Sequence, residues 1–150
     1  MIFTELTRTL ASRFGLSELA ANQDGMIRLA FEGGIDVDIE PETEHDALHI
    51  YTTLGPQSED PAVLSRLLAA NLFGKETGGA VIALDDFLKE CLLARTFALS
   101  TLDPDAFLAA LEDFVNYAEL WRNRLISGDL TSYPVRDDPL AARPDLMIRA

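Results

Sequence analysis

The sequence predicts one α+β domain, in which three helices cover an antiparallel sheet in the order α-β-β-β-α-β-β-α. In three segments the apolar residues recur at steps of three and four, which places them on one face of a helix. In most of the intervening segments apolar and polar residues alternate, as in strands with one buried and one wet face. The length of 150 residues fits a single domain with its own core.

The first helix is expected within residues 1–14, and Gly15 permits the left-handed backbone that commonly ends helices. Its apolar face would carry Ile2, Phe3, Leu6, Leu10 and Phe14. Two interpretations stay open for this face, because every surface helix shows such a stripe. The helix either only closes one side of the sheet or also lines a groove beside the sheet edge.

Three strands are predicted next, as an antiparallel meander. Residues 27–31 and 35–40 alternate in polarity and flank Gly33-Gly34, which supplies the positive φ angles of a tight hairpin. Residues 48–54 continue the same alternation as the third strand.

The second helix is expected to start at Asp60-Pro61 and to end at Gly74. Asp is a favoured N-cap, and proline at the first helical position loses no hydrogen bond. Arg66 is the only charged residue between Pro61 and Gly74. A helix with so few polar residues is expected to be covered on more than one side, which in a small domain indicates a subunit contact.

Residues 80–84 and about 90–97 are predicted to form two further strands, followed by a long amphipathic helix. Asp103-Pro104 repeats the cap-and-proline start, and Gly128 is a plausible stop. The domain is therefore placed at residues 1–127. Residues 128–150 contain three prolines and few large apolar side chains, so they are predicted to form a flexible tail.

The charge of the chain excludes several classes of partner. A formal net charge of −13 argues against nucleic acid, because phosphate binding needs clustered Lys and Arg, and it disfavours anionic membranes. No apolar run approaches the roughly 20 residues needed to cross a bilayer, so no membrane insertion is expected. Cys91 is the single cysteine, and the N-terminus lacks the features of a signal peptide. A reducing cytoplasm is the expected location.

No catalytic residue, cofactor or metal site is predicted. Acidic residues occupy every second position from Asp36 to Asp46, but they lack the spacing of a calcium-binding loop. Alternation along a strand would place these carboxylates on a solvated face. His45 and His49 lie between a turn and a strand, so they are interpreted as surface or packing residues. Cys91 is interpreted as a small buried hydrophobe.

A series of features between Asn71 and Leu125 resembles the class I (CesT-like) type III secretion chaperones, also called the Tir chaperone family. The series contains a helix end, a Gly-Gly entry to a strand that ends in Asp, a second strand, and a long amphipathic helix that ends near a tryptophan. These features correspond to residues 71–74, 77–85, 92–97, 102–115 and 118–121. The rest of the chain to Leu125 fits the same layout.

The resemblance implies that the protein is a homodimer that binds an extended N-terminal segment of a secreted effector, keeps it soluble and hydrolyses no ATP. The secretion-system ATPase would be a downstream partner, and part of the effector segment can add a strand to the sheet. The candidate effector-binding residues are Phe3, Leu6, Leu10, Phe14, Ile27, Leu29 and Phe31. The candidate dimer residues are Leu64, Leu67, Leu68, Leu72 and Val81.

Two alternatives remain at this stage. The same layout resembles the YbjN-like bacterial proteins, which share the sheet-and-helix fold but are not tied to secretion. A small enzyme or metal protein that uses His45, His49 and the acidic strand is the second alternative.

Overall fold

The computed structural model describes residues 3–131 and 148–149, and it confirms the predicted α+β fold. The elements are α1 (Phe3–Arg13), β1 (Ile27–Phe31), β2 (Ile35–Glu42), β3 (Ala47–Pro56), α2 (Pro61–Ala70), β4 (Val81–Asp85), β5 (Glu90–Ala98), α3 (Pro104–Ser127) and β6 (Ile148–Arg149). The order of the first eight elements is the predicted α-β-β-β-α-β-β-α.

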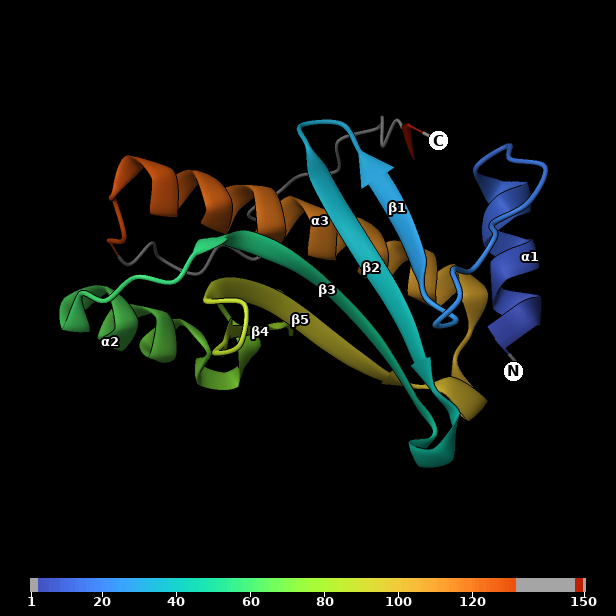
Figure 1. Ribbon diagram of the computed structural model, residues 1–150, viewed down its shortest axis with the longest axis horizontal. Helices are drawn as coiled ribbons and strands as arrows, with labels where there is room; N and C mark the ends of the chain where they lie inside the picture. The colour runs from blue at the N-terminus through green and yellow to red at the C-terminus, as the bar shows by residue number, and fades with distance from the viewer. Residues whose placement is uncertain (1–2, 132–147, 150) are drawn as a thin grey trace.

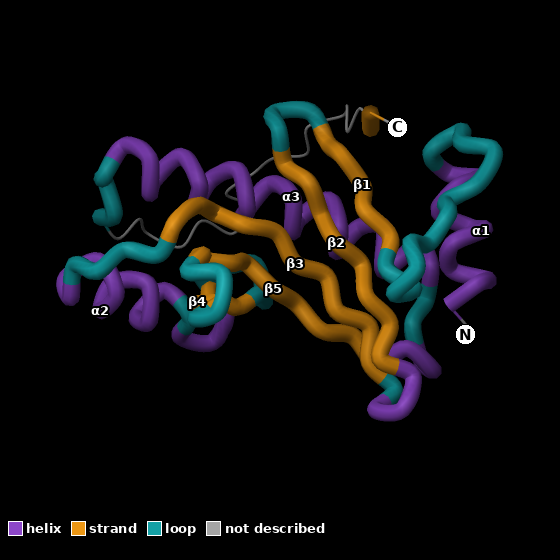
Figure 2. The backbone as a smooth tube through the Cα atoms, in the orientation of Figure 1, coloured by secondary structure: helices purple, strands orange, loops and turns teal. Residues whose placement is uncertain are grey.

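The strands form one antiparallel sheet in the order β4-β5-β3-β2-β1-β6. The predicted meander of β1, β2 and β3 is confirmed, and β5 pairs along β3 and places β4 at the far side of the sheet. Figures 1 and 2 show α3 running across one face of the sheet, with α1 beside β1 and α2 beside β4.

The core lies between α3 and the sheet. Phe107, Phe114 and Trp121 of α3 are buried, and Phe97 of β5 meets Phe107 edge-on with ring centroids 5.3 Å apart. Leu6 and Leu10 of α1, together with the inward-facing residues of β1 and β2, belong to the same cluster. The first helix is therefore part of the core of the chain.

The helix caps confirm the predicted starts of α2 and α3. The carboxylate of Asp60 accepts a hydrogen bond of 2.9 Å from the backbone N–H of Ala62. Asp103 accepts one of 2.9 Å from Ala106. Gly128 ends α3 with a φ of 74°, in the left-handed region that glycine adopts without strain.

The second helix ends earlier than predicted. Regular helix stops at Ala70, and Leu72–Gly74 form a short 3₁₀ turn in which Phe73 has a φ of 54°. The side chain of Asn71 explains the position of the break. Its amide donates to the carbonyl of Ile82 (2.9 Å) and accepts from the N–H of the same residue (2.7 Å), which anchors the end of the helix to β4.

The turn between β4 and β5 contains no glycine. It is stabilised by hydrogen bonds to the side chain of Asp85. Its carboxylate accepts hydrogen bonds of 3.0 Å from the N–H groups of both Phe87 and Leu88. Lys89 adopts the left-handed conformation, with a φ of 56°. This local bonding sets the strand register with Asp85 opposite Glu90.

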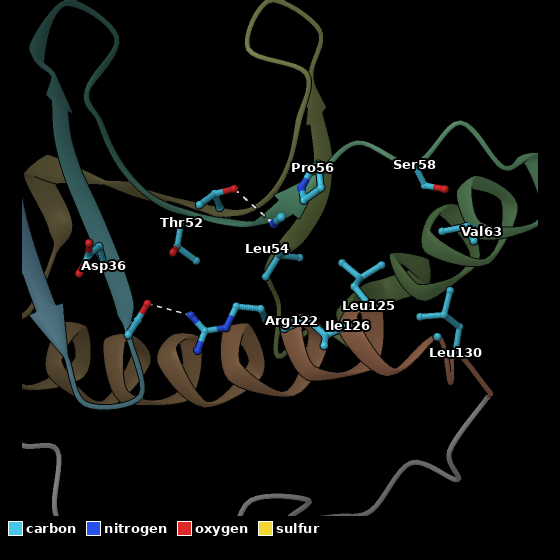
Figure 3. Close-up of a pocket in the computed structure, with 14 residues that line it drawn as sticks. Asp36, Thr52, Leu54, Pro56, Ser58, Val63, Arg122, Leu125, Ile126 and Leu130 are labelled. Atoms are coloured by element: carbon cyan, nitrogen blue, oxygen red, sulfur yellow. Dashed lines mark hydrogen bonds between the residues drawn. The ribbon is translucent and has the colours of Figure 1, made fainter.

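β2 and β3 separate along part of their length, because the N-terminal part of β2 pairs only with β1 and its C-terminal part pairs with β3. Ile35–Ile39 pair with β1, whereas Asp38–Glu42 pair with β3, whose register with β2 ends at Tyr51. β3 pairs with β5 along its whole length, and from Thr52 onward it diverges from β2, as Figures 1 and 2 show. A cavity, drawn in Figure 3, lies where the two halves separate above the C-terminal half of α3.

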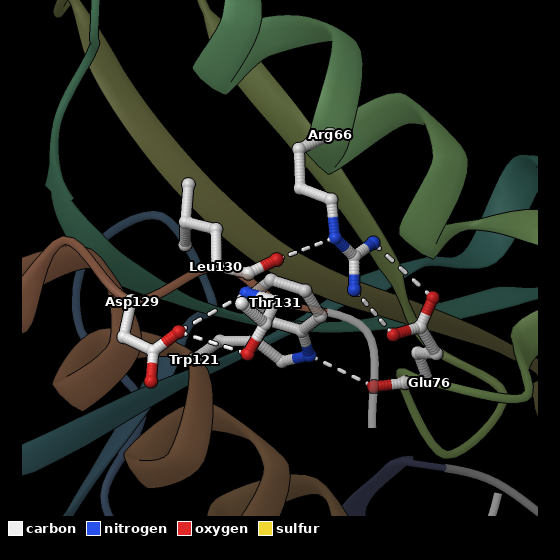
Figure 4. Close-up of polar contacts among 6 residues, drawn as sticks. All are labelled: Arg66, Glu76, Trp121, Asp129, Leu130 and Thr131. Atoms are coloured by element: carbon white, nitrogen blue, oxygen red, sulfur yellow. Dashed lines mark hydrogen bonds and ion pairs between the residues drawn. The ribbon is translucent and has the colours of Figure 1, made fainter. Parts of the chain in front are cut away.

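Arg66 connects α2 to three other parts of the chain (Figure 4). Its guanidinium donates to both carboxylate oxygens of Glu76, at 2.6 and 3.2 Å, and to the carbonyl of Leu130 at 2.6 Å. The indole N–H of Trp121 donates to the carbonyl of Glu76 at 2.8 Å. The Arg66 guanidinium also lies 5.6 Å from the centroid of the Trp121 ring.

The predicted flexible tail is described only in part. Leu130 packs against the core and accepts the hydrogen bond from Arg66, so the chain directly after α3 contacts the domain. Ile148–Arg149 form β6, which pairs with the end of β1. Residues 132–147 lie outside the described residues.

Replacing Arg66 with lysine is expected to lower the free energy of unfolding by about 1.5–3 kcal/mol. Lysine keeps the charge but cannot form the planar fork that meets Glu76 and Leu130 together, and hydrogen bonds to charged groups are worth about that much. The side chains of Arg66 and Glu76 are 16% and 22% exposed, so solvent screens this pair only weakly. Urea unfolding measures the change.

Lys89→Met is the matched control for this prediction. Lys89 forms an ion pair with Asp86 in which both side chains are more than half exposed. Exposed pairs of this kind typically contribute about 0–1 kcal/mol. Equal losses in the two variants would contradict the structural role of Arg66.

Candidate protein-binding site

Most residues of the predicted effector groove are closed off inside the chain. Leu6, Leu10, Ile27, Leu29 and Phe31 are each no more than 3% exposed and pack in the core, while Phe3 and Phe14 are partly buried against it. The structure therefore brings all seven together, as predicted, but as core contacts rather than as an open groove. A role of these residues in client binding stays a prediction.

Part of the predicted dimer surface is exposed. Leu68, Leu72 and Val81 are 73%, 63% and 52% exposed, whereas Leu67 is buried in the core and Leu64 is partly buried. Two residues that the sequence interpretation did not select, Phe73 and Leu84, are also exposed. We call Leu68, Leu72, Phe73, Val81 and Leu84 the α2–β4 surface.

Phe73 is placed on this surface by backbone geometry. A regular helix through Gly74 would have turned its side chain by a different angle, but the break after Ala70 and the positive φ of Phe73 leave the ring 85% exposed. The apolar run at the end of the helix was the available signal. The break itself depends on Asn71 and Ile82, which are eleven positions apart in the sequence.

The outer side of α2 carries no charge in the part of the chain that the structure describes. Arg66 is the only charged residue between Pro61 and Gly74, and its side chain turns inward to Glu76, Trp121 and Leu130 (Figure 4). A surface of large apolar side chains without a neighbouring charge on the same helix is typical of a protein contact.

The cavity at the division of the sheet is a second candidate site. We call it the split-sheet cavity; it has a volume of about 570 Å³. Its apolar lining comes from three elements and the segment after α3, namely Leu54 and Pro56 of β3, Val63 of α2, Leu125 and Ile126 of α3, and Leu130. Figure 3 shows these side chains around the opening between β3, α2 and α3.

Polar groups lie at one end of the split-sheet cavity. Arg122 donates to the carbonyls of Gly33 and Gly34, with 2.8 Å to the latter, and so fixes the β1–β2 turn to α3. Asp36 and Thr52 line the same end. Ile126, one helical turn after Arg122 on α3, is 77% exposed. The cavity thus combines a mostly apolar lining with a few polar groups, the usual composition of a binding site.

The acidic face of β2 is held by ion pairs and hydrogen bonds. Asp36 and Glu40 are exposed as predicted, but Asp38 is only 8% exposed, so the expectation of a solvated carboxylate is wrong for this residue. The side chain of Arg28 covers it and donates to both of its oxygens at 2.7 Å. Cross-strand pairing placed this cation opposite Asp38, which the spacing within one strand could not indicate.

The two histidines meet at a single carboxylate. His45 Nδ1 lies 2.8 Å and His49 Nε2 lies 2.9 Å from the oxygens of Glu42. These hydrogen bonds, the one from His49 first, hold the pKa of Glu42 below its ordinary value. Within residues 3–131 and 148–149, no group of three or more His, Cys, Asp or Glu side chains is arranged to hold a metal ion.

Cys91 is buried in β5, and burial raises the pKa of its thiol to about 11. A thiol in this state is a poor nucleophile, because the thiolate is the reactive form. No helix in the described part of the chain is long and apolar enough to cross a membrane.

Comparisons with known proteins identify related sequences. Residues 5–122 match the model of the Tir chaperone protein (CesT) family. The Chlamydia pneumoniae protein CPj0713/CpB0740 is 30% identical over 125 residues, which cover 81% of this chain and 94% of that protein.

Solved structures share the fold at low sequence identity. The HopA1–SchA chaperone–effector complex matches with a TM-score of 0.70 at 14% identity, over 81% of this chain and 93% of that chain. The ExsC–ExsE complex gives 0.68 at 20% identity, over 80% and 90%. The Yersinia pestis type III secretion chaperone SycH, in complex with a fragment of YscM2, gives 0.64 at 21% identity, over 80% and 99%.

The family match extends from α1 into α3 and includes the whole α2–β4 surface, whereas Leu125, Ile126 and Leu130 of the split-sheet cavity lie beyond it. It also favours the CesT-like interpretation of the sequence over the YbjN-like one. The chain belongs to the Tir chaperone protein (CesT) family.

Proposed function

We propose that this protein is a cytoplasmic type III secretion chaperone that, as a homodimer, binds an extended N-terminal segment of a secreted effector. Membership of the CesT family carries the chaperone assignment, and the proteins of this family bind effectors and are not enzymes. Of the related structures, SchA is described in a chaperone–effector complex with HopA1. Binding would keep the effector segment soluble and ready for the secretion apparatus, whose ATPase would be the downstream partner.

The α2–β4 surface supports the homodimer. It presents five large apolar side chains that the chain itself leaves more than 40% exposed, and the inward turn of Arg66 removes the one charge of α2 from it. Because the chain has a net charge of −13, two copies repel each other at long range. An uncharged apolar contact, which removes this surface from water, is what can overcome that repulsion.

Replacing Leu68 with aspartate is expected to convert the dimer to a monomer at micromolar concentration. The side chain is 73% exposed in the single chain, so the substitution spares the core. In the dimer it would bury an unpaired charge in an apolar contact. Multi-angle light scattering measures the mass.

Ile126→Asp is the matched control for the dimer. Ile126 is a similarly exposed apolar residue, but it lies on α3 beside the split-sheet cavity. This variant should remain dimeric. A monomeric unmodified protein, or a dimeric Leu68→Asp variant, would contradict the assignment of the interface.

The split-sheet cavity supports the binding of apolar effector side chains. The cavity is open to solvent and its lining is mostly apolar, whereas five of the seven sequence-predicted groove residues are enclosed in the core. A volume of about 570 Å³ has room for more than one large side chain. We therefore place the apolar anchors of the effector in this cavity.

Replacing Ile126 with aspartate should weaken effector retention by about tenfold or more. Burying one large apolar side chain typically contributes about 1.5–3 kcal/mol, and the new carboxylate would also lose water on binding. The effector is first identified by mass spectrometry after pull-down from the native cytoplasm. Retention by each variant is then quantified with that effector, while circular dichroism verifies the fold.

The two aspartate variants test the two surfaces in a crossed design. Ile126→Asp should retain less effector and stay dimeric. Leu68→Asp should become monomeric. Normal effector retention by a folded, dimeric Ile126→Asp protein would remove the split-sheet cavity from the proposal.

A further inference from the structure

One buried polar side chain of the split-sheet cavity lacks a hydrogen-bond partner. Thr52 shares the inward face of β3 with the core residues Ile50 and Leu54, and it is only 3% exposed. It lines the cavity, and within the described part of the chain its hydroxyl makes no hydrogen bond. Figure 3 shows the Thr52 side chain pointing from β3 toward α3. Buried polar groups are nearly always hydrogen-bonded, so this hydroxyl is available to a bound molecule.

The strands on both sides of Thr52 explain why its hydroxyl is left unpaired. The pairing of β3 with β2 ends at Tyr51, which lies opposite Asp38, so Thr52 is the first residue of β3 beyond it. On the other side Thr52 lies opposite Leu93 of β5, which is apolar and fully buried. Neither neighbouring strand therefore offers a polar side chain in register with Thr52.

The other polar groups of the lining are engaged or face water. Thr53 and Ser58 accept hydrogen bonds from backbone N–H groups two residues further along the chain, at 3.3 and 3.2 Å. The guanidinium of Arg122 donates to two carbonyls of the β1–β2 turn. Asp36 is exposed. Thr52 is thus the hydroxyl of the lining that is both buried and free to pair with a bound group.

The occupant that fits this cavity has a large apolar body and a neutral polar tip. The body matches the apolar part of the lining, which consists of Leu54, Pro56, Val63, Leu125, Ile126 and Leu130. A purely apolar occupant would cover the Thr52 hydroxyl and leave it without any partner, which costs free energy. An ammonium group that reached Thr52 would lose its water, and desolvating a charge costs more than desolvating a hydroxyl. A phenol meets both requirements, because its ring is apolar and its hydroxyl both donates and accepts.

We propose that the split-sheet cavity selects a phenolic side chain and that Thr52 is the residue that recognises the phenol hydroxyl. The inference rests on the proposed function, since the phenol would belong to a tyrosine of the client segment. It adds a polar criterion to the apolar anchors: of two client segments with similar apolar content, the one that places a tyrosine in the cavity binds more tightly.

Small side-chain analogues test this selection on the full-length protein without an effector. p-Cresol corresponds to the side chain of tyrosine and toluene to that of phenylalanine, so the two differ only in the hydroxyl. NMR titration measures the affinity of each, with the signals of Thr52, Leu54 and Leu125 reporting on the cavity. p-Cresol is expected to bind about tenfold more tightly than toluene, because it alone pairs with Thr52. A cavity without a hydrogen-bond partner would give the opposite order, since p-cresol loses more hydration on entry.

Two substitutions at Thr52 separate the hydroxyl from the shape of the side chain. Thr52→Val removes the hydroxyl and keeps the branched shape, so it should weaken p-cresol binding about tenfold and leave toluene binding unchanged. Thr52→Ser keeps the hydroxyl and should retain the preference for p-cresol. Because the hydroxyl has no partner in the fold, Thr52→Val should not lower the melting temperature measured by circular dichroism.

Thr9→Val is the matched control. It removes a threonine hydroxyl that donates to the carbonyl of Glu5 within α1, away from the residues that line the cavity. Its binding of p-cresol should equal that of the unmodified protein. n-Butylamine, the analogue of the lysine side chain, is the charged probe and should bind more weakly than p-cresol.

Equal or tighter binding of toluene or n-butylamine would overturn the selection of a phenol, and so would a preference for p-cresol that persists in Thr52→Val. Signal changes confined to the α2–β4 surface would overturn the cavity as the site. These measurements contain no effector, so their failure would leave the chaperone proposal standing. Normal effector retention by Ile126→Asp would in turn remove the cavity from the client proposal and leave the measured order of the analogues unaffected.

Discussion

The contact of Arg66 with Glu76, Trp121 and Leu130 determines both candidate surfaces. It draws the only charged side chain of α2 into the domain, which leaves the outward side of that helix apolar. It also holds Leu130 beside α2, so that Leu130 and Val63 form one wall of the split-sheet cavity. One partly buried guanidinium therefore shapes a surface suited to a second subunit and a cavity suited to a client. Arginine fits this position because its planar fork can meet several acceptors at once.

Local sequence patterns were sufficient for the order and type of the first eight elements. Steps of three and four located α1 and α3, alternation located β1 and β2, and Asp-Pro pairs located the starts of two helices. These signals work because each depends on neighbouring residues alone. The end of α2 could not be located in this way, because it depends on hydrogen bonds between Asn71 and Ile82 of β4, eleven positions later in the sequence.

Which apolar face is covered, and by what, could not be predicted in the same way. The stripe of Leu6 and Leu10 has the periodicity of a helix face, but periodicity is the same whether the face packs on the chain's own sheet or on another protein. The split-sheet cavity arises because β2 changes partner near Asp38, and its lining comes from segments far apart in the sequence. Likewise, the pairing of Ile148 with Phe31 joins two segments that are far apart in the sequence.

The strong negative charge and the apolar surfaces have separate physical roles. Charge acts over roughly 8 Å at physiological ionic strength, so it governs how cationic segments approach and how acidic chains repel each other. Apolar side chains contribute binding free energy only when direct contact removes their surface from water, so they determine which partners stay bound. In this chain Arg28 pairs with Asp38 and Arg66 pairs with Glu76, so these cations cover or bridge carboxylates on the domain itself. Asp36 of β2 is exposed and lines the split-sheet cavity, so a carboxylate lies beside the apolar lining of that cavity.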